Sequence, residues 1–284
     1  MNKRSAVFRM KRISLPWVLA ILFAVLWLII TGGPFLFQIF STFKTQGEFI
    51  SSSLFDLPQK LNFENYVTVF NGGFHIYFLN SSIVIVISLT LLLFLSAFAA
   101  YPLSRMKFKL NRLIYAAIVA MMSIPIHITL IPLFVMAIRI RLYDSPLALI
   151  GPNVAFNLPI SVFILTAFML TISKEMEEAA EIDGCGKFST FFKIIFPLSK
   201  SGLATLGIYN GVMIWNEFLF AMVLTQSVPA RTLPLAVWQY QGQYAMDIPV
   251  IMTVLGLSTL PVILLYIFGQ DKLVKGMMAG AVKG

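Results

Sequence analysis

The sequence predicts an all-α, polytopic membrane protein that forms a single domain over residues 1–284. Of the 284 residues, 58% are hydrophobic and only 12% are charged, and the mean hydropathy is +0.86. Average soluble domains have about 25% charged residues. Apolar runs that are long enough to cross a bilayer as helices recur along the chain. These observations exclude an ordinary soluble fold.

Six apolar runs are long enough to be transmembrane helices. The first contains the sequence TGGP at residues 31–34, where we expect a bend in a retained span. A cleaved signal peptide is the alternative, but this run is longer than a signal-peptide core and lacks an A-x-A cleavage site. The third contains Pro125 and Pro132, at which we expect kinks. The six predicted spans cover residues 16–43, 78–101, 113–138, 147–172, 203–225 and 249–269.

Basic residues are unevenly distributed over the polar segments between these runs. Of the 21 Lys and Arg, 16 fall in the segments that six spans place on one side, which are residues 1–15, 102–112, 173–200 and 270–284. The other side, which includes the outer loops 44–77 and 226–248, holds only five. Because loops rich in Lys and Arg stay in the cytoplasm, we predict that both termini are cytoplasmic. Topology and anionic membrane lipid then explain the net charge of +9, and no nucleic-acid partner is expected.

The sequence lacks the residues that several kinds of chemistry need. Cys185 is the one cysteine, so the chain cannot form an internal disulfide. There are two histidines, His75 and His127, and no HExxH motif, so no metal site is predicted. A GxxxxGK(S/T) phosphate-binding loop is also missing. Any nucleotide chemistry must therefore belong to another chain.

Residues 173–200 form the longest polar-rich stretch, and we predict a helix, a glycine turn and a second helix there. Ser173 is placed to cap the first helix, whose acidic first turn suits the positive end of the helix dipole. Gly184 is placed for a left-handed C-cap. The second helix covers residues 187–195, and Pro197 marks a break before the next span. The residues alone leave two interpretations open, namely a solvated interfacial loop and a docking module.

The spacing of this stretch resembles the EAA motif of the permease subunits of ABC importers. The motif residues stand here as Glu178-Ala179-Ala180, Gly184, Ile194 and Pro197. The resemblance covers nearly the whole chain and is greatest to the carbohydrate-uptake branch, in particular to maltose-type six-span permeases. The stretches that carry it include NFENYVTVF, YPLSRMKFK, WNEFLFAMVLT and GMMAGAVKG. The departures from the family pattern are Ser173 in place of Pro, Cys185 in place of Ala or Ser, and Phe196 in place of Leu.

The resemblance implies the type I ABC importer permease fold, with six transmembrane helices and a cytoplasmic coupling helix pair in residues 173–200. Glu178 would meet a basic residue in a cleft of an ATPase subunit, and Gly184 would allow the turn. The expected ATPase-coupling residues are Glu178, Ala179, Ala180, Asp183, Gly184, Ile194 and Pro197. This chain would not be an enzyme and would hold no cofactor, because ATP and Mg would be bound by the partner ATPase.

The same resemblance implies the assembly and its location. The expected partners are a second homologous permease subunit, two ATPase subunits, an extracytoplasmic sugar-binding protein and membrane lipid. The expected location is the bacterial cytoplasmic membrane. Importers of mono-, di- and oligosaccharides, polyols and glycerophosphodiesters share this pattern. An ion-coupled secondary transporter is the alternative, but it would need ionisable residues within several spans and inverted repeats.

Glu217 is the one acidic residue inside a predicted span, where a charge usually faces a bundle interior or a water-filled path. Trp215 and Asn216 precede it directly, and Asn210 lies about two turns earlier. Aromatic faces stack on apolar faces of sugars, while amides and carboxylates bind hydroxyl groups. We therefore expect these four residues in a substrate pathway. The structural alternative is that Glu217 hydrogen-bonds near the outer interface and Trp215 anchors the helix there.

Overall fold

The computed structural model describes residues 15–240 and 247–281, which are mostly helical and contain no β-strand. The longer helices are α1 (Leu15–Thr42), α4 (Phe74–Arg105), α5 (Asn111–Met121), α6 (Leu130–Arg139), α7 (Ile150–Met169), α11 (Lys200–Trp215) and α13 (Ile248–Ala281). The shorter α-helices are α2 (Gln46–Ser51), α3 (Glu64–Asn71), α8 (Glu175–Ile182), α9 (Lys187–Thr190), α10 (Phe196–Leu198) and α12 (Leu219–Leu224). The 3-10 segments are η1 (Ile126–Thr129), η2 (Pro146–Leu149), η4 (Val228–Ala230) and η5 (Leu233–Tyr240), and η3 (Phe191–Ile195) is π-helical.

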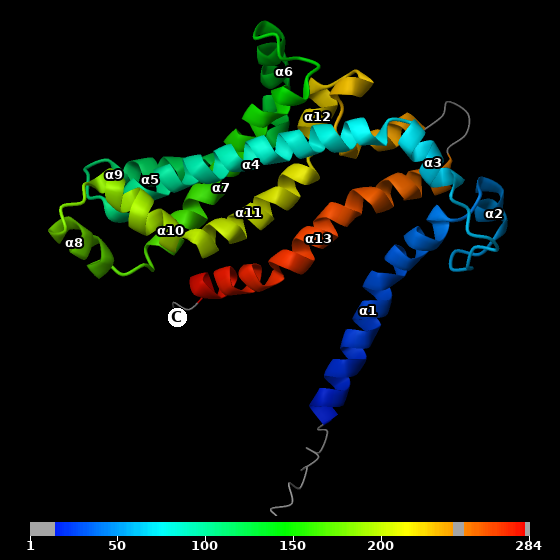
Figure 1. Cartoon of the computed structure of the whole chain (residues 1–284), viewed down its shortest axis with the longest axis horizontal. Helices are drawn as coiled ribbons and strands as arrows, with labels where there is room; N and C mark the ends of the chain where they lie inside the picture. The colour runs from blue at the N-terminus through cyan, green and yellow to red at the C-terminus, as the bar shows by residue number, and fades with distance from the viewer. Residues whose placement is uncertain (1–14, 241–246, 282–284) are drawn as a thin grey trace, which may run out of the picture.

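The body of the molecule is a bundle of α4, α7 and α11, which contact one another along the long axis. Helix α13 packs against α11 on one side and against α1 on the other. Figure 1 shows α8 and α9 at one end of the long axis and α2 and α3 at the opposite end. The polar 173–200 segment therefore lies far from the segments that precede α4.

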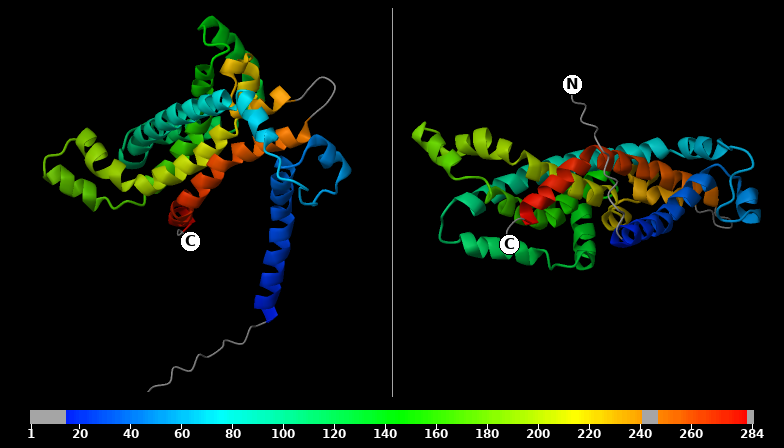
Figure 2. Two further views of the ribbon diagram at one scale, coloured as in Figure 1. Left: turned by 45° about the vertical axis from the view of Figure 1, so that its right-hand side comes forward. Right: turned by 90° about the horizontal axis from the view of Figure 1, so that it is seen from below.

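Helix α1 stands away from this bundle (Figure 2). None of its most apolar stretch is buried, and only Ser41 and Thr42 at its C-terminal end are buried in the chain. An apolar helix with no cover from its own chain requires lipid or another membrane helix around it. The helix runs unbroken through residues 31–34, with Pro34 inside it.

Four helices of the described chain are long and apolar enough to cross a membrane: residues 15–42, 74–105, 146–169 and 248–270. Two further pairs of helices pass the same test only together, and each pair is bent. Residues 111–121 and 126–139 meet at 91°, and residues 187–198 and 200–215 meet at 68°. The predicted number of six spans is reached only if each bent pair crosses as one.

Two predicted spans are wrong as continuous helices. The third, residues 113–138, breaks between α5 and η1, where Pro125 has an extended backbone (φ −66°, ψ 130°). Proline has no amide proton and disfavours a helical residue before it, so α5 ends at Met121. The fifth, residues 203–225, breaks between α11 and α12 at residues 216–218.

Two buried polar side chains of α4, Asn80 and Ser81, hold the loop after α12. The Asn80 side-chain amide on α4 donates to the carbonyls of Pro229 and Arg231, at 2.7 and 2.9 Å. The next residue, Ser81, accepts a hydrogen bond at its Oγ from the amide of Leu233 at 2.8 Å. Each bond satisfies a backbone group that would otherwise be costly to bury. The loop after α12 is therefore held firmly onto α4.

A carboxylate joins the loop after α6 to the loop after α12. Asp144 Oδ1 accepts hydrogen bonds from the amides of Gln226 (2.7 Å) and Ser227 (2.8 Å). Partial burial alone would raise the pKa of Asp144, but these bonds, with a smaller contribution from the charge of Arg231, outweigh it and hold the pKa below its ordinary value. The Asp144 backbone is left-handed, with φ 59°. Asparagine tolerates that conformation as well as aspartate does.

Substituting Asp144→Asn should therefore remove the charge without straining the backbone. At neutral pH we expect the apparent Tm of the purified protein to fall by about 2–4 °C, since charge-assisted bonds at a part-exposed site contribute about 1 kcal/mol. Because the folded-state pKa is depressed, this contribution is present above the unfolded-state pKa and is lost as pH falls through the folded-state pKa. Thermal melts across pH check this, and an equal deficit at every pH would contradict it.

Candidate functional site

The turn after α8 has the geometry that its glycine predicts. Cys185 N donates to the Ala180 carbonyl at 2.8 Å, and Gly184 N donates to the Glu181 carbonyl at 3.1 Å. Gly184 has φ +79°, in the left-handed region. This pair of bonds is a Schellman motif, which satisfies the last carbonyls of α8 and reverses the chain. The first helix and its glycine turn are confirmed as local structure.

The start of α8 differs slightly from the prediction. The helix begins at Glu175, so the capping position is Lys174 and not Ser173. The Ser173 hydroxyl still accepts a bond from the Glu175 amide, at 3.2 Å. Ser173 thus stabilises the approach to the helix through a side-chain turn and leaves the cap without a side-chain bond.

The second helix is longer than predicted. It runs through α9, η3 and α10 as far as Leu198, so Pro197 lies inside its last turn, where it has no amide proton to donate to the preceding turn. The chain bends by 68° after Leu198, just before α11. Phe191 and Ile195 are buried against the bundle, whereas the Phe188 side chain is 77% exposed. The side of this helix that carries Phe191 and Ile195 is therefore packed, and the side that carries Phe188 is not.

The expected coupling residues lie in two places, an exposed group on α8 and its turn and a half-buried pair in the following helix. Glu178, Ala179, Asp183 and Gly184 are exposed on α8 and its turn, while Ala180 is buried. The half-buried pair is Ile194 and Pro197, which lie in the helix that precedes α11. An ion pair between Lys187 and Glu181 joins α9 to α8 across the turn, and its hydrogen bond raises the pKa of Lys187.

The structure adds Arg105, which the sequence analysis placed only in the basic 102–112 segment and in the stretch YPLSRMKFK. Arg105 lies at the end of α4, and its Nε is 3.0 Å from Glu177 Oε1 on α8. Its guanidinium also donates to the carbonyls of Met169 and Ile172, where α7 ends. The Arg105 and Glu177 side chains are 2% and 14% exposed. The sequence places Arg105 after one apolar run and Glu177 after another. Spacing alone does not show that these two residues form an ion pair.

Substituting Gly184→Ala isolates the requirement for the turn. No atom lies within 4 Å of a Cβ built on Gly184, so the cost is backbone strain alone, about 1 kcal/mol for a left-handed residue. Amide hydrogen exchange of residues 176–186 should then accelerate by about fivefold.

Gly186 provides the matched control, since its surroundings are equally open but its φ is −73°. Gly186→Ala should leave the exchange rates of the same peptide close to those of the unmodified chain. Equal acceleration in the two variants would refute the strained-turn explanation.

The four expected pathway residues do not form one site. Asn210 is buried, and its side-chain amide donates to Ser161 Oγ on α7 at 2.9 Å. The Glu217 carboxylate accepts hydrogen bonds from the amides of Phe220 (2.6 Å) and Ala221 (3.1 Å) and so caps α12. Both residues thus have structural partners in the described chain, and neither lines the cavity between α1 and α13.

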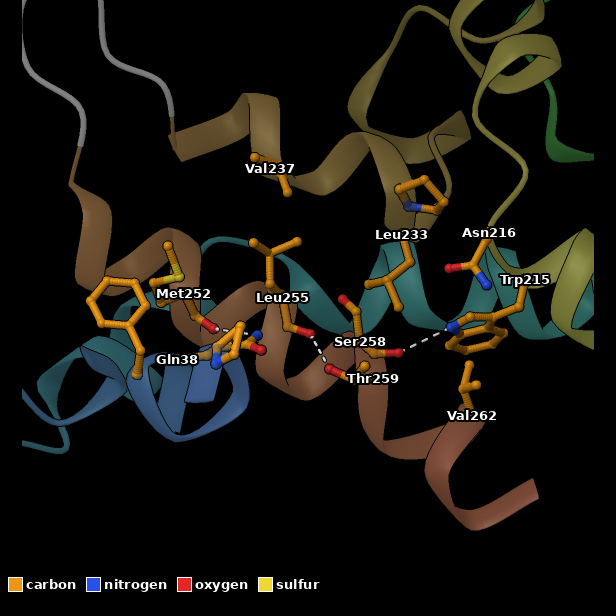
Figure 3. Close-up of a pocket in the computed structure, with 13 residues that line it drawn as sticks. Gln38, Trp215, Asn216, Leu233, Val237, Met252, Leu255, Ser258, Thr259 and Val262 are labelled. Atoms are coloured by element: carbon orange, nitrogen blue, oxygen red, sulfur yellow. Dashed lines mark hydrogen bonds between the residues drawn. The ribbon is translucent and has the colours of Figure 1, made fainter. Parts of the chain in front are cut away.

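Trp215 and Asn216 do line that cavity, which has a volume of about 720 Å³. Figure 3 shows it between α1, the end of α11, η5 and α13, with Gln38 towards one end and Trp215 towards the other. The Trp215 indole donates to the Ser258 carbonyl at 3.0 Å. Asn216 is exposed, and its amide donates to the Val212 carbonyl at 2.9 Å. The wall is mostly apolar with a few amides and hydroxyls, which is typical of small-molecule pockets.

Comparison with known proteins identifies the family. The family described as "Binding-protein-dependent transport system inner membrane component" matches residues 92–279. This chain belongs to that family. It is therefore an inner-membrane permease subunit of an ABC transporter, and the alternative of a secondary transporter is not supported.

Relatives and a solved structure agree with this assignment. The protein ORF2 of Caldicellulosiruptor sp. (strain Rt8B.4), which is named for an ABC transporter permease, is 52% identical over 93% of this chain and 96% of its own length. The melibiose/raffinose/stachyose import permease protein MelC of Bacillus subtilis (strain 168) is 32% identical over 88% of this chain and 91% of its own. A chain of a bacterial ABC transporter involved in the import of the acidic polysaccharide alginate has the same fold, with a TM-score of 0.80, 21% identity, and coverage of 95% and 99% of the two chains.

Proposed function

We propose that this permease imports a carbohydrate that an extracytoplasmic solute-binding protein delivers, using ATP hydrolysed on separate ATPase chains. Membership of the binding-protein-dependent family carries the proposal. The similarity to a permease named for melibiose, raffinose and stachyose import supports a carbohydrate as the solute. The cavity beside Trp215 and Asn216 is compatible with it, because an aromatic ring and amides suit a sugar. These two residues are our candidates for contact with the solute, whereas we assign Asn210 and Glu217 structural roles.

The 173–200 segment is the proposed docking site for the ATPase. Its exposed residues lie at one end of the long axis, on a compact pair of helices closed by the turn at Gly184 (Figure 1). Glu178 is exposed there with its carboxylate available to a basic partner. ATP and Mg would be held by the ATPase, so this chain acts as a mechanical element. The surface of α1, which its own chain leaves uncovered, is the proposed contact for a second permease subunit.

The proposed orientation places this end of the molecule in the cytoplasm. The basic 102–112 loop adjoins α8 in space, through Arg105 and Glu177. The loops with few basic residues lie towards the α2–α3 end (Figure 1). Residues 1–14 and 282–284, which belong to the predicted cytoplasmic ends, lie outside the described residues. The charge bias of the whole sequence supports cytoplasmic termini.

Purification of the chain from its native membrane tests the proposed assembly. We expect it to leave the membrane in detergent with an ATPase and a second permease, and ATP hydrolysis by the particle should rise when the solute-binding protein encoded beside it is added. Gel analysis and phosphate release measure the two outcomes. A particle of this chain alone that carries out transport would overturn the proposal.

Charge reversal at Glu178 tests the docking site. Glu178→Lys should reduce the amount of co-purifying ATPase by about tenfold or more, since it replaces an attraction across the interface by repulsion. Insertion into the membrane should be unchanged, because the side chain is exposed. Glu175→Lys is the control, because Glu175 is exposed on the same helix outside the expected motif. Normal ATPase recovery with Glu178→Lys would show that the docking assignment is wrong.

A further inference from the structure

Arg105, on α4, contacts the residues that connect α7 to α8. The chain leaves α7 at Met169 and enters α8 at Glu175, so a short linker separates the two helices. Arg105 donates to the carbonyl of Met169 at the end of α7 and to that of Ile172 within the linker, and it pairs with Glu177 on α8. One side chain thus contacts both sides of the linker.

These contacts use features that are specific to arginine. The final carbonyls of α7 have no partner within their helix, and a cation at a helix C-terminus is favourable. The planar guanidinium can donate in several directions at once, so it bonds the two carbonyls while its Nε lies 3.0 Å from the Glu177 carboxylate, in an ion pair that makes no hydrogen bond. The pair with Glu177 is nearly dry, with side-chain exposures of 2% and 14%. Removing either charge would leave the other buried without its partner, which is costly.

The last turn of α4 also contacts the second helix of the 173–200 segment. The Tyr101 hydroxyl donates to the Lys187 carbonyl at 3.4 Å, and the Tyr101 ring lies 5.1 Å from the ring of Phe191. Tyr101 itself is buried. The end of α4 therefore contacts both helices of the segment: Arg105 contacts α8, and Tyr101 contacts α9.

We propose that Arg105 is a positioning residue that fixes α8 to α4, so that movement of the 173–200 segment passes into α4 as well as into the helices to which it is joined by the chain. This inference rests on the proposed function of the segment. Helix α4 forms the most extensive helix contact of the described chain, with α7. A force applied at α8 would then move α4, α7 and α11 as one body.

The native Cys185 thiol reports whether Arg105 holds α8. Cys185 is the one cysteine of the chain and lies half-buried in the turn after α8. In native membrane vesicles that contain the assembled complex, Arg105→Ala and Glu177→Gln should each raise its rate of reaction with N-ethylmaleimide by about tenfold. The rate is measured by mass spectrometry of the Cys185 peptide.

Three variants make this measurement specific. Glu175→Gln, which removes an exposed charge from the same helical turn, should leave the rate unchanged. The double variant Arg105→Ala, Glu177→Gln should react no faster than Arg105→Ala alone, because the two residues act through one contact. Arg105→Lys should restore part of the protection, since it keeps the charge but not the guanidinium fork. Unchanged rates in the single variants, or additive rates in the double variant, would overturn the positioning of α8.

The transmission to α4 is tested with a second thiol. A Lys107→Cys, Cys185→Ser chain places the reporter in the exposed residue after the α4 cap. Addition of ATP and Mg should change the labelling of Cys185 in the native chain and of the residue-107 thiol in the reporter chain. With Glu177→Gln added, the ATP response of Cys185 should persist and that at residue 107 should fall, with a remainder carried by the Tyr101 contact and by the packing of α4 on α7. Persistence of both responses at full size would overturn the transmission, whereas no response to ATP at either thiol of the otherwise native chain would count against the proposed function itself.

Discussion

Polar groups that leave water must find partners inside the protein, and polar side chains meet this constraint at several of the places where the helices of the chain end. Between α11 and α12 the break exposes backbone amides, and the Glu217 carboxylate accepts bonds from two of them. After α7, Arg105 donates to the carbonyls of Met169, the last residue of the helix, and of Ile172 in the linker. In the loop after α12, carbonyls are bonded by Asn80. These three interruptions are thus each bonded by a polar side chain, and Arg105 and Asn80 tie theirs to α4.

The consequence is a bundle with defined ends. At one end, Asn80, Ser81 and Asp144 fasten the loops onto the helices. At the other, Arg105 and Tyr101 fasten the helix–turn–helix of residues 173–200. The apolar stretch of α1 is left exposed by the rest of the chain. The cavity beside Trp215 is lined in part by the other end of this helix. In the proposed function, the 173–200 end receives the force from an ATPase and the helices fastened to it move with it.

Hydropathy and turn chemistry predicted much of this architecture from sequence. Apolar runs located the long helices, and Gly184 located the turn because a left-handed residue there is nearly always glycine. The breaks at Pro125 and at residues 216–218 were not predicted. Proline inside an apolar run commonly only kinks a membrane helix, and the polar pair Asn216-Glu217 has apolar residues on both sides. Proline was expected to kink the third span, but the 91° bend depends on packing that no linear pattern records.

The candidate sites were less predictable for a related reason. Trp215, Asn216 and Glu217 are adjacent in sequence, yet the break between α11 and α12 sends Glu217 to cap the next helix while Asn216 lines the cavity. The contact of Arg105 with Glu177 joins residues 72 positions apart, and it emerges only when α4 and α7 lie side by side. The spacing of the EAA-like motif located the 173–200 segment, but not the residue of α4 that holds it.

The central claim is that the end of the molecule formed by α8 and its turn receives an ATPase subunit. A benzophenone maleimide attached to Cys185 in the assembled, purified complex tests it most directly, because that thiol is half-buried beside the exposed Gly184. After irradiation, the account predicts a covalent adduct between this chain and the ATPase, identified by mass spectrometry. Adducts with lipid or with a permease chain alone, in a complex that contains the ATPase, would contradict it.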